Sequence, residues 1–132
     1  MKRLKRAHLV IFSLLLIPMF IQLSCKDEKT FQYNIDDLTD TYWGISQIIE
    51  VNPNITNPEI TAPTVFYKDG LVEFEQKEID YWRIYNTRSI LIENKAQIWQ
   101  ILYLSRDSLH VNILIYPMGD FIMECLYTPM DL

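Results

Sequence analysis

The chain has few of the residues that build metal centres, disulfides and phosphate-binding loops. Among 132 residues there are two cysteines, two histidines and three glycines. His8 and Cys25 lie in the N-terminal segment, which leaves His110 and Cys125 for the rest of the chain. A structural zinc site needs four ligands, a disulfide needs two free thiols, and a phosphate loop needs clustered glycines. We therefore expect no metal ion and no cofactor.

The sequence also offers little that could form a catalytic set. Ser108, His110 and Asp107 are the residue types of a hydrolytic triad, but they are too close along one segment to converge as a triad does. Glu73 and Glu75 are two residues apart, so in a strand they face the same side. That spacing indicates a solubilising face rather than an acid–base pair. We expect that the protein is not an enzyme.

The N-terminus has the layout of a bacterial lipoprotein signal. It opens with four basic residues, Lys2, Arg3, Lys5 and Arg6. The apolar run Leu9–Ile21 suits a secretory signal and is shorter than the roughly 20 residues of a spanning helix. Gln22-Leu23-Ser24-Cys25 then resembles a lipobox, which implies removal of residues 1–24 and acylation of Cys25. The alternatives are an uncleaved anchor and an ordinary signal peptide.

Removal of this segment changes the charge of the chain. Residues 25–132 hold eight basic and seventeen acidic residues, a formal net charge of −9 against −5 for the whole chain. Phosphate backbones repel such a domain, so we expect no nucleic-acid partner. Lys26-Asp27-Glu28 resembles the signal that directs lipoproteins of Bacteroidota to the outer face of the outer membrane. We predict a lipid-anchored outer-membrane protein, which is exposed at the cell surface if these three residues act as that signal. The alternative for them is a solvated tether, which leaves the choice between the periplasmic and the surface leaflet open.

The remaining sequence predicts one all-β domain. Residues 25–34 are predicted as the acylated cysteine and a linker, and residues 35–132 as the domain, with Asn34 capping a helical turn over Ile35–Leu38. Strands are predicted at Tyr42–Glu50, Thr64–Tyr67, Leu71–Lys77, Tyr81–Tyr85, Ser89–Glu93, Gln97–Ser105, Ser108–Tyr116 and Asp120–Tyr127. Asp69-Gly70 predicts a tight hairpin, and Val51–Pro63 is the one long connection. Short strands and tight turns favour an antiparallel meander of about eight strands that closes into a barrel.

The last predicted hairpin can be assigned a register. A five-residue loop, Tyr116–Asp120, pairs Ile115 with Phe121 and Val111 with Cys125. This register places Cys125 inside and His110 outside. The strand Gln97–Ser105 is more ambiguous, because it is apolar on both faces. Its two alternating sets are Ile98, Leu102 and Leu104 on one face, and Trp99, Ile101 and Tyr103 on the other. One set should fill the core, and the other is either covered or exposed as a binding patch.

Three segments together resemble a family, the lipocalin-like lipoproteins of Bacteroidota. These segments are Leu38–Trp43, Val65–Gly70 and Ile98–Leu109. The resemblance covers about residues 38–127 and implies an eight-stranded, up-and-down, lipocalin-like barrel of mostly unassigned function. The chain departs from the family at Thr41, where a glycine is usual two residues before the opening tryptophan. No functional residue carries over from the family.

Aromatic residues are the remaining indication of function. Four of them are predicted to line the barrel interior, namely Trp43, Phe74, Trp82 and Trp99. Arg83 alternates with Tyr81 and Tyr85 and is the predicted interior charge, placed to bind a ligand carboxylate or to extend outward. The first hypothesis is non-catalytic binding of a small apolar ligand in the barrel. The alternative is a protein-interaction module that uses an exposed apolar strand face or the Val51–Pro63 loop.

Overall fold

The fold begins with a single helical turn that is fixed by its capping residue. The computed structural model describes residues 30–55, 63–75 and 77–131, so the predicted signal, Cys25 and the first part of the linker lie outside it. Helix α2 (Ile35–Leu38) starts at Asn34, whose side chain accepts a hydrogen bond from the Asp36 backbone N–H at 3.0 Å. The predicted turn and its cap are confirmed. No helix in the described ranges is long and apolar enough to cross a bilayer.

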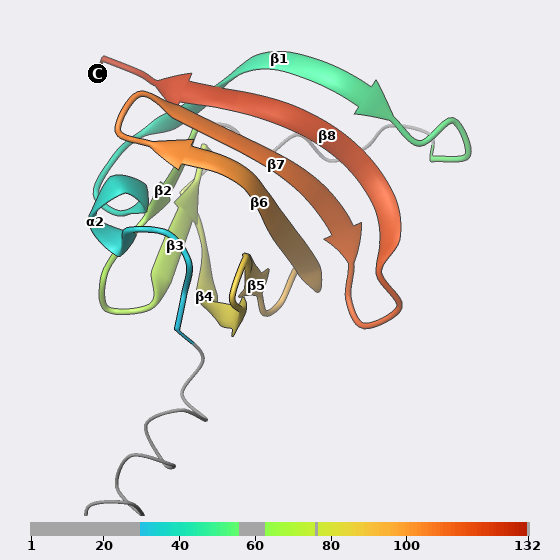
Figure 1. Cartoon of the computed structure of the whole chain (residues 1–132), viewed down its shortest axis with the longest axis horizontal. Coiled ribbons are helices and arrows are strands. Elements are labelled where there is room, and N and C mark those ends of the chain that lie inside the picture. The colour runs from blue at the N-terminus through green and yellow to red at the C-terminus, as the bar shows by residue number, and fades with distance from the viewer. Residues whose placement is uncertain (1–29, 56–62, 76, 132) are drawn as a thin grey trace, which may run out of the picture. The chain divides into compact units, whose positions relative to one another are not determined.

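Eight strands follow and close on themselves (Figure 1). They are β1 (Trp43–Val51), β2 (Thr64–Phe66), β3 (Leu71–Phe74), β4 (Glu78–Asn86), β5 (Ser89–Ile92), β6 (Gln97–Ser105), β7 (Ser108–Ile115) and β8 (Asp120–Pro129). Each strand pairs antiparallel with the next, and β8 returns to β1. The prediction of an all-β, eight-stranded antiparallel barrel is confirmed. Gly70 has a φ of 93°, as the tight turn between β2 and β3 requires.

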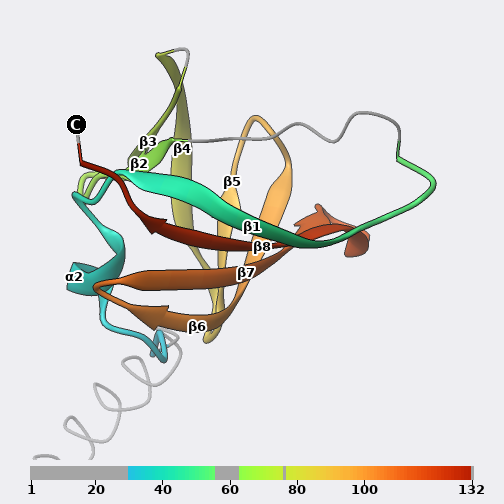
Figure 2. The ribbon, with the colours of Figure 1, turned by 90° about the horizontal axis from the view of Figure 1, so that it is seen from above.

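Strand pairing is extensive on one side of the barrel wall and very short where β1 meets β2. Strands β1, β8, β7 and β6 lie side by side along most of their length (Figure 2). Among the described residues, a single pair, Trp43 with Thr64, joins β1 to β2. Strand β1 also has two register shifts against β8, which make Ser46 and Ile49 extra residues in the ladder. Beyond Gly44, β1 is therefore an irregular edge.

The last hairpin follows the predicted register only in part. Val111 pairs with Cys125, as predicted. Ile115 pairs with Asp120 rather than with Phe121, so that part of the prediction is wrong. The cause is a bulge that leaves Ile122 as an extra residue in β8, just after the loop. A register counted outward from the loop is therefore wrong for the residues between the loop and the bulge.

A second bulge changes the faces of β6. Ile101 pairs with Val111, but Tyr103 pairs with His110, which leaves Leu102 as the extra residue. Leu102 and Tyr103 are 43% and 55% exposed, while Leu104 packs against the core. The predicted grouping of Tyr103 with the inward Trp99 is therefore wrong, and so is the grouping of Leu104 with Ile98, because a bulge reverses the alternation beyond it.

The two ends of the barrel are built differently. The α2 end holds α2 and the turns β2–β3, β4–β5 and β6–β7. Leu38 of α2 is fully buried there, and its carbonyl accepts a hydrogen bond from Trp43 Nε1 at 2.9 Å. The distal end holds the connections β1–β2, β3–β4, β5–β6 and β7–β8. Charged side chains of β4 and the β5–β6 turn lie at this end.

Candidate functional site

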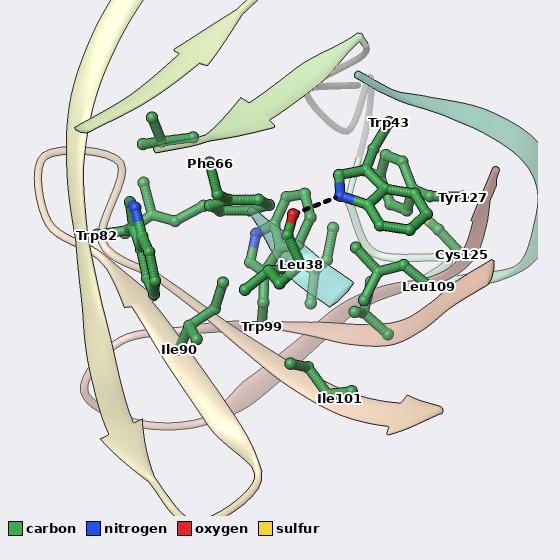
Figure 3. Packing of buried hydrophobic residues seen from close by; sticks show 14 of the residues in the cluster. Leu38, Trp43, Phe66, Trp82, Ile90, Trp99, Ile101, Leu109, Cys125 and Tyr127 are labelled. Atoms are coloured by element: carbon green, nitrogen blue, oxygen red, sulfur yellow. Dashed lines mark hydrogen bonds between the residues drawn. The ribbon is translucent and has the colours of Figure 1, made fainter. Parts of the chain in front are cut away.

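A line of aromatic rings crosses the barrel interior (Figure 3). Phe66 contacts Trp82 at 5.7 Å and Trp99 at 5.5 Å between ring centroids, both edge to face. Trp99 then stacks on Tyr127 at 5.2 Å. All four side chains are buried, and Trp43 belongs to the same buried cluster. The interior along this line is filled by the chain's own rings, which such pairings stabilise by about 0.5–1.5 kcal/mol each beyond burial.

The predicted ligand-lining residues Trp43, Phe74, Trp82 and Trp99 are all buried in this core. The structure brings them together as packing partners. Each indole N–H also donates to the protein itself. The acceptors are the Leu38 carbonyl at 2.9 Å for Trp43, the Tyr67 carbonyl at 2.8 Å for Trp82, and Gln97 Oε1 at 3.2 Å for Trp99. These polar atoms are committed to the fold, as buried polar groups generally are.

Arg83 does not lie inside the barrel, which corrects the prediction. Its Nε donates to Glu93 Oε1 at 2.7 Å, and both side chains are about half exposed. Arg83 does share a face with Tyr81, as predicted, but that face is the outer one. The neighbouring Trp82 pairs with the buried Ile92 and takes the inward position.

Asp80 is an interior charge that the sequence analysis did not identify. It lies two residues before Trp82 and is buried on the same face. Its Oδ1 accepts from the backbone N–H groups of Tyr81 at 2.7 Å and Asn94 at 2.9 Å, and its Oδ2 accepts from that of Lys95 at 3.0 Å. Asp80 thus fixes the β5–β6 turn to β4. The alternation Glu78, Asp80, Trp82 is the signal that could have placed it.

Lys95 is the cation of this distal cluster. Its side chain is 6% exposed, and its Nζ lies 3.2 Å from Glu78 Oε2 and 4.8 Å above the centre of the Phe74 ring. The cation lies over the negative face of that ring. The Glu78 side chain is more than half exposed, so water competes with Lys95 for its carboxylate. The cluster therefore combines a structural cap with a partly exposed ion pair.

The outer wall carries a second set of aromatic side chains. Tyr85 of β4 and Tyr116 after β7 meet edge to face at 5.9 Å. Strands β5 and β6 lie between β4 and β7, so these rings must reach across them. Leu91 and Ile98 pair across β5 and β6 on this face and are buried. This explains how the Ile98 face of β6 is covered. We call Tyr81, Arg83, Tyr85, Tyr116 and Met118 the outer tyrosine surface.

His110 and Cys125 lie on opposite faces, as predicted. His110 Nε2 lies 2.6 Å from Glu124 Oε2 on the outer face. Cys125 is buried inside, and burial, assisted by the charge of Glu124, raises the pKa of its thiol to about 11. Within the described ranges, no group of three or more His, Cys, Asp or Glu side chains is placed to hold a metal ion.

The comparisons with known proteins add no assignment to this geometry. No family model, curated protein or solved structure matches the chain. The resemblance to lipocalin-like lipoproteins stays a prediction. The functional argument therefore depends on the aromatic interior, the distal cluster and the outer tyrosine surface.

Proposed function

We propose that this chain is a lipid-anchored, non-catalytic protein of a bacterial outer membrane that acts as a protein-interaction module. The anchor is supported by the basic start, the apolar run Leu9–Ile21 and the lipobox-like Gln22–Cys25. The lipocalin-like identity of the barrel is part of the same proposal and is supported by its eight consecutive antiparallel strands.

The observation that carries the interaction role is the outer tyrosine surface. Tyrosine, arginine and methionine are enriched where proteins bind one another, because tyrosine contributes a large contact area with little loss of conformational freedom. Met118 is 80% exposed at the tip of the β7–β8 turn, and Tyr81 is also mostly exposed. The Arg83–Glu93 pair adds a polar margin. A partner could cover this surface without any change in the barrel.

The filled interior supports the same choice. A ligand in the middle of the barrel would have to displace Trp99 or Phe66, which are buried against other rings. Creating a cavity of that size in a core costs about 3–5 kcal/mol. Binding at the outer surface carries no such cost.

Site-specific photocrosslinking in the native host tests the proposal. A photoreactive residue at Tyr81 and one at Met118 should each give the same discrete adduct with one other protein. The matched control is Asp107, an exposed residue in the β6–β7 turn at the α2 end. Tyr116→Ser should reduce the adduct at residue 81. Equal adducts at all three positions, or none at residues 81 and 118, would contradict the proposal.

Binding of a small ligand remains the second candidate because of Lys95. A small anion could compete with the half-exposed Glu78 carboxylate for the ammonium. Native mass spectrometry of the full chain from its host should then show a small-molecule adduct that Lys95→Met reduces and Arg83→Met does not. A bare protein mass in both would rule this candidate out.

A further inference from the structure

The chain joins the barrel at the α2 end and is fastened there from residue 31 onward. The Gln32 backbone N–H donates to the β4–β5 turn, at the Thr87 carbonyl, at 2.7 Å. The Tyr33 hydroxyl donates to the Ile101 carbonyl on β6 at 2.9 Å. Arg88 Nε donates to Gln32 Oε1, also at 2.9 Å. These bonds join the segment to the β4–β5 turn and to the middle of β6, so it is fixed against the barrel.

The connection between this fixed point and residue 25 is short. Six peptide steps separate Cys25 from Phe31, and a chain spans at most about 3.5 Å per residue, or about 21 Å in all. The inference here rests on the acylated Cys25 of the proposed function. With acyl chains in a bilayer, the α2 end would be held within about 21 Å of the membrane surface.

Exposed apolar side chains lie next to the fixed point. Leu102 and Tyr103, exposed by the β6 bulge, directly follow Ile101, whose carbonyl holds Tyr33. Arginines flank them in the adjoining turns. Arg88 lies beside β6, since its carbonyl accepts from the Ile101 N–H at 2.8 Å, and Arg106 follows β6 with a largely exposed side chain 3.8 Å from Asp37. We call Arg88, Leu102, Tyr103 and Arg106 the entry patch.

We propose that the entry patch rests on the surface of the phospholipid bilayer. Tyrosine rings are favoured at the depth of the lipid headgroups, since one end is apolar and the other polar. Leucine adds apolar area, and arginine forms paired hydrogen bonds with phosphate. The short tether brings this combination to the membrane. Contact there turns the distal Met118 away from the membrane.

Lipid-quenching fluorescence on the full, acylated chain tests this contact. One fluorophore is attached through Tyr103→Cys and, in a matched control, through Met118→Cys. Both positions are exposed, so neither change disturbs the core. Cys125 remains unlabelled because it is buried and its pKa is raised. The proteins are placed in vesicles of phosphatidylethanolamine and phosphatidylcholine, with or without brominated acyl chains.

We expect bromolipid to quench the probe at residue 103 at least twofold more than the probe at residue 118. Leu102→Glu should reduce that quenching, because it places a charge in the contact. Equal quenching at the two positions overturns the inference and leaves the entry patch to a protein partner. The mass of the N-terminal peptide separates the two proposals: an acylated Cys25 with equal quenching overturns the membrane contact alone, whereas an unmodified Cys25 overturns the anchor as well.

Discussion

The two ends of the barrel are closed by side chains of different chemistry, apolar at one end and charged at the other. At the α2 end the closing group is hydrocarbon, with Leu38 fully buried and its carbonyl bonded to Trp43. At the distal end the closing groups are charged, with Lys95 between Phe74 and Glu78. The apolar closure is strongly stabilising, because it removes hydrocarbon surface from water. A charged closure is weaker, because water competes with an ion pair at the surface.

The largest expected effect comes from opening the α2 end. Leu38→Ala removes a fully buried side chain and should lower the free energy of unfolding by about 3 kcal/mol, because the cavity can collapse only in part. Urea denaturation followed by tryptophan fluorescence measures it. Leu102→Ala, at an exposed position, should change the same quantity by less than about 1 kcal/mol. Equal losses in the two variants would show that Leu38 does not close the barrel.

The distal cap should rank second. Asp80→Ala removes the acceptor of three backbone N–H groups and leaves them without that partner. We expect a loss of about 1–3 kcal/mol in the free energy of unfolding, together with faster hydrogen exchange at Asn94 and Lys95. Unchanged exchange in the β5–β6 turn would argue against the cap. Asp107→Ala at an exposed position is the control.

The ion pair of the distal end should contribute less than its cap. Glu78 is more than half exposed, and pairs of this kind contribute about 0–1 kcal/mol. A double-mutant cycle with Lys95→Met and Glu78→Gln should give a coupling energy in that range, decreasing as salt is added. A coupling energy above about 2 kcal/mol would mean that the charged closure is as strong as the hydrocarbon one.

The smallest effect is expected at Tyr67, at the α2 end. Burial, then the hydrogen bond to Glu73 and its negative charge, raise the pKa of Tyr67 to about 12 from 10.0. Because the folded pKa is raised, the stabilising effect is complete below about pH 10 and is lost as the pH rises to about 12. Ultraviolet absorbance titration should show a late-ionising tyrosine fraction that Tyr67→Phe reduces by one residue. Tyr103→Phe should leave it in place.

The sequence predicts the strands well because each is bounded by turn residues and carries an alternating pattern. Gln97–Ser105 begins and ends as predicted, and the pairing of Val111 with Cys125 is also as predicted. Alternation gives two sets of side chains but does not say which set faces inward. For β4 that choice is made by β5, and Ser89–Ile92 is buried on both faces. The sequence of β5 therefore could not indicate that Trp82 faces inward and Arg83 outward.

Bulges account for the remaining differences. One extra residue in β6 and one in β8 reverse the alternation beyond them. Neither position has a glycine or proline that could signal it; Leu102 is an ordinary strand residue. Asp80 and Lys95 were missed for a related reason, since they meet through a turn whose geometry the alternation of single strands does not determine.

The irregular edge of β1 would matter if copies of the chain were anchored close together on a membrane. Copies anchored on one surface would meet at high local concentration, where a regular exposed edge would let neighbouring molecules zip into a shared sheet. The extra residues Ser46 and Ile49 interrupt the even spacing of N–H and C=O groups that such zipping needs. Both bulges lie on the strand that, among the described residues, is joined to β2 by a single pair, Trp43 with Thr64, so they would disfavour such lateral pairing.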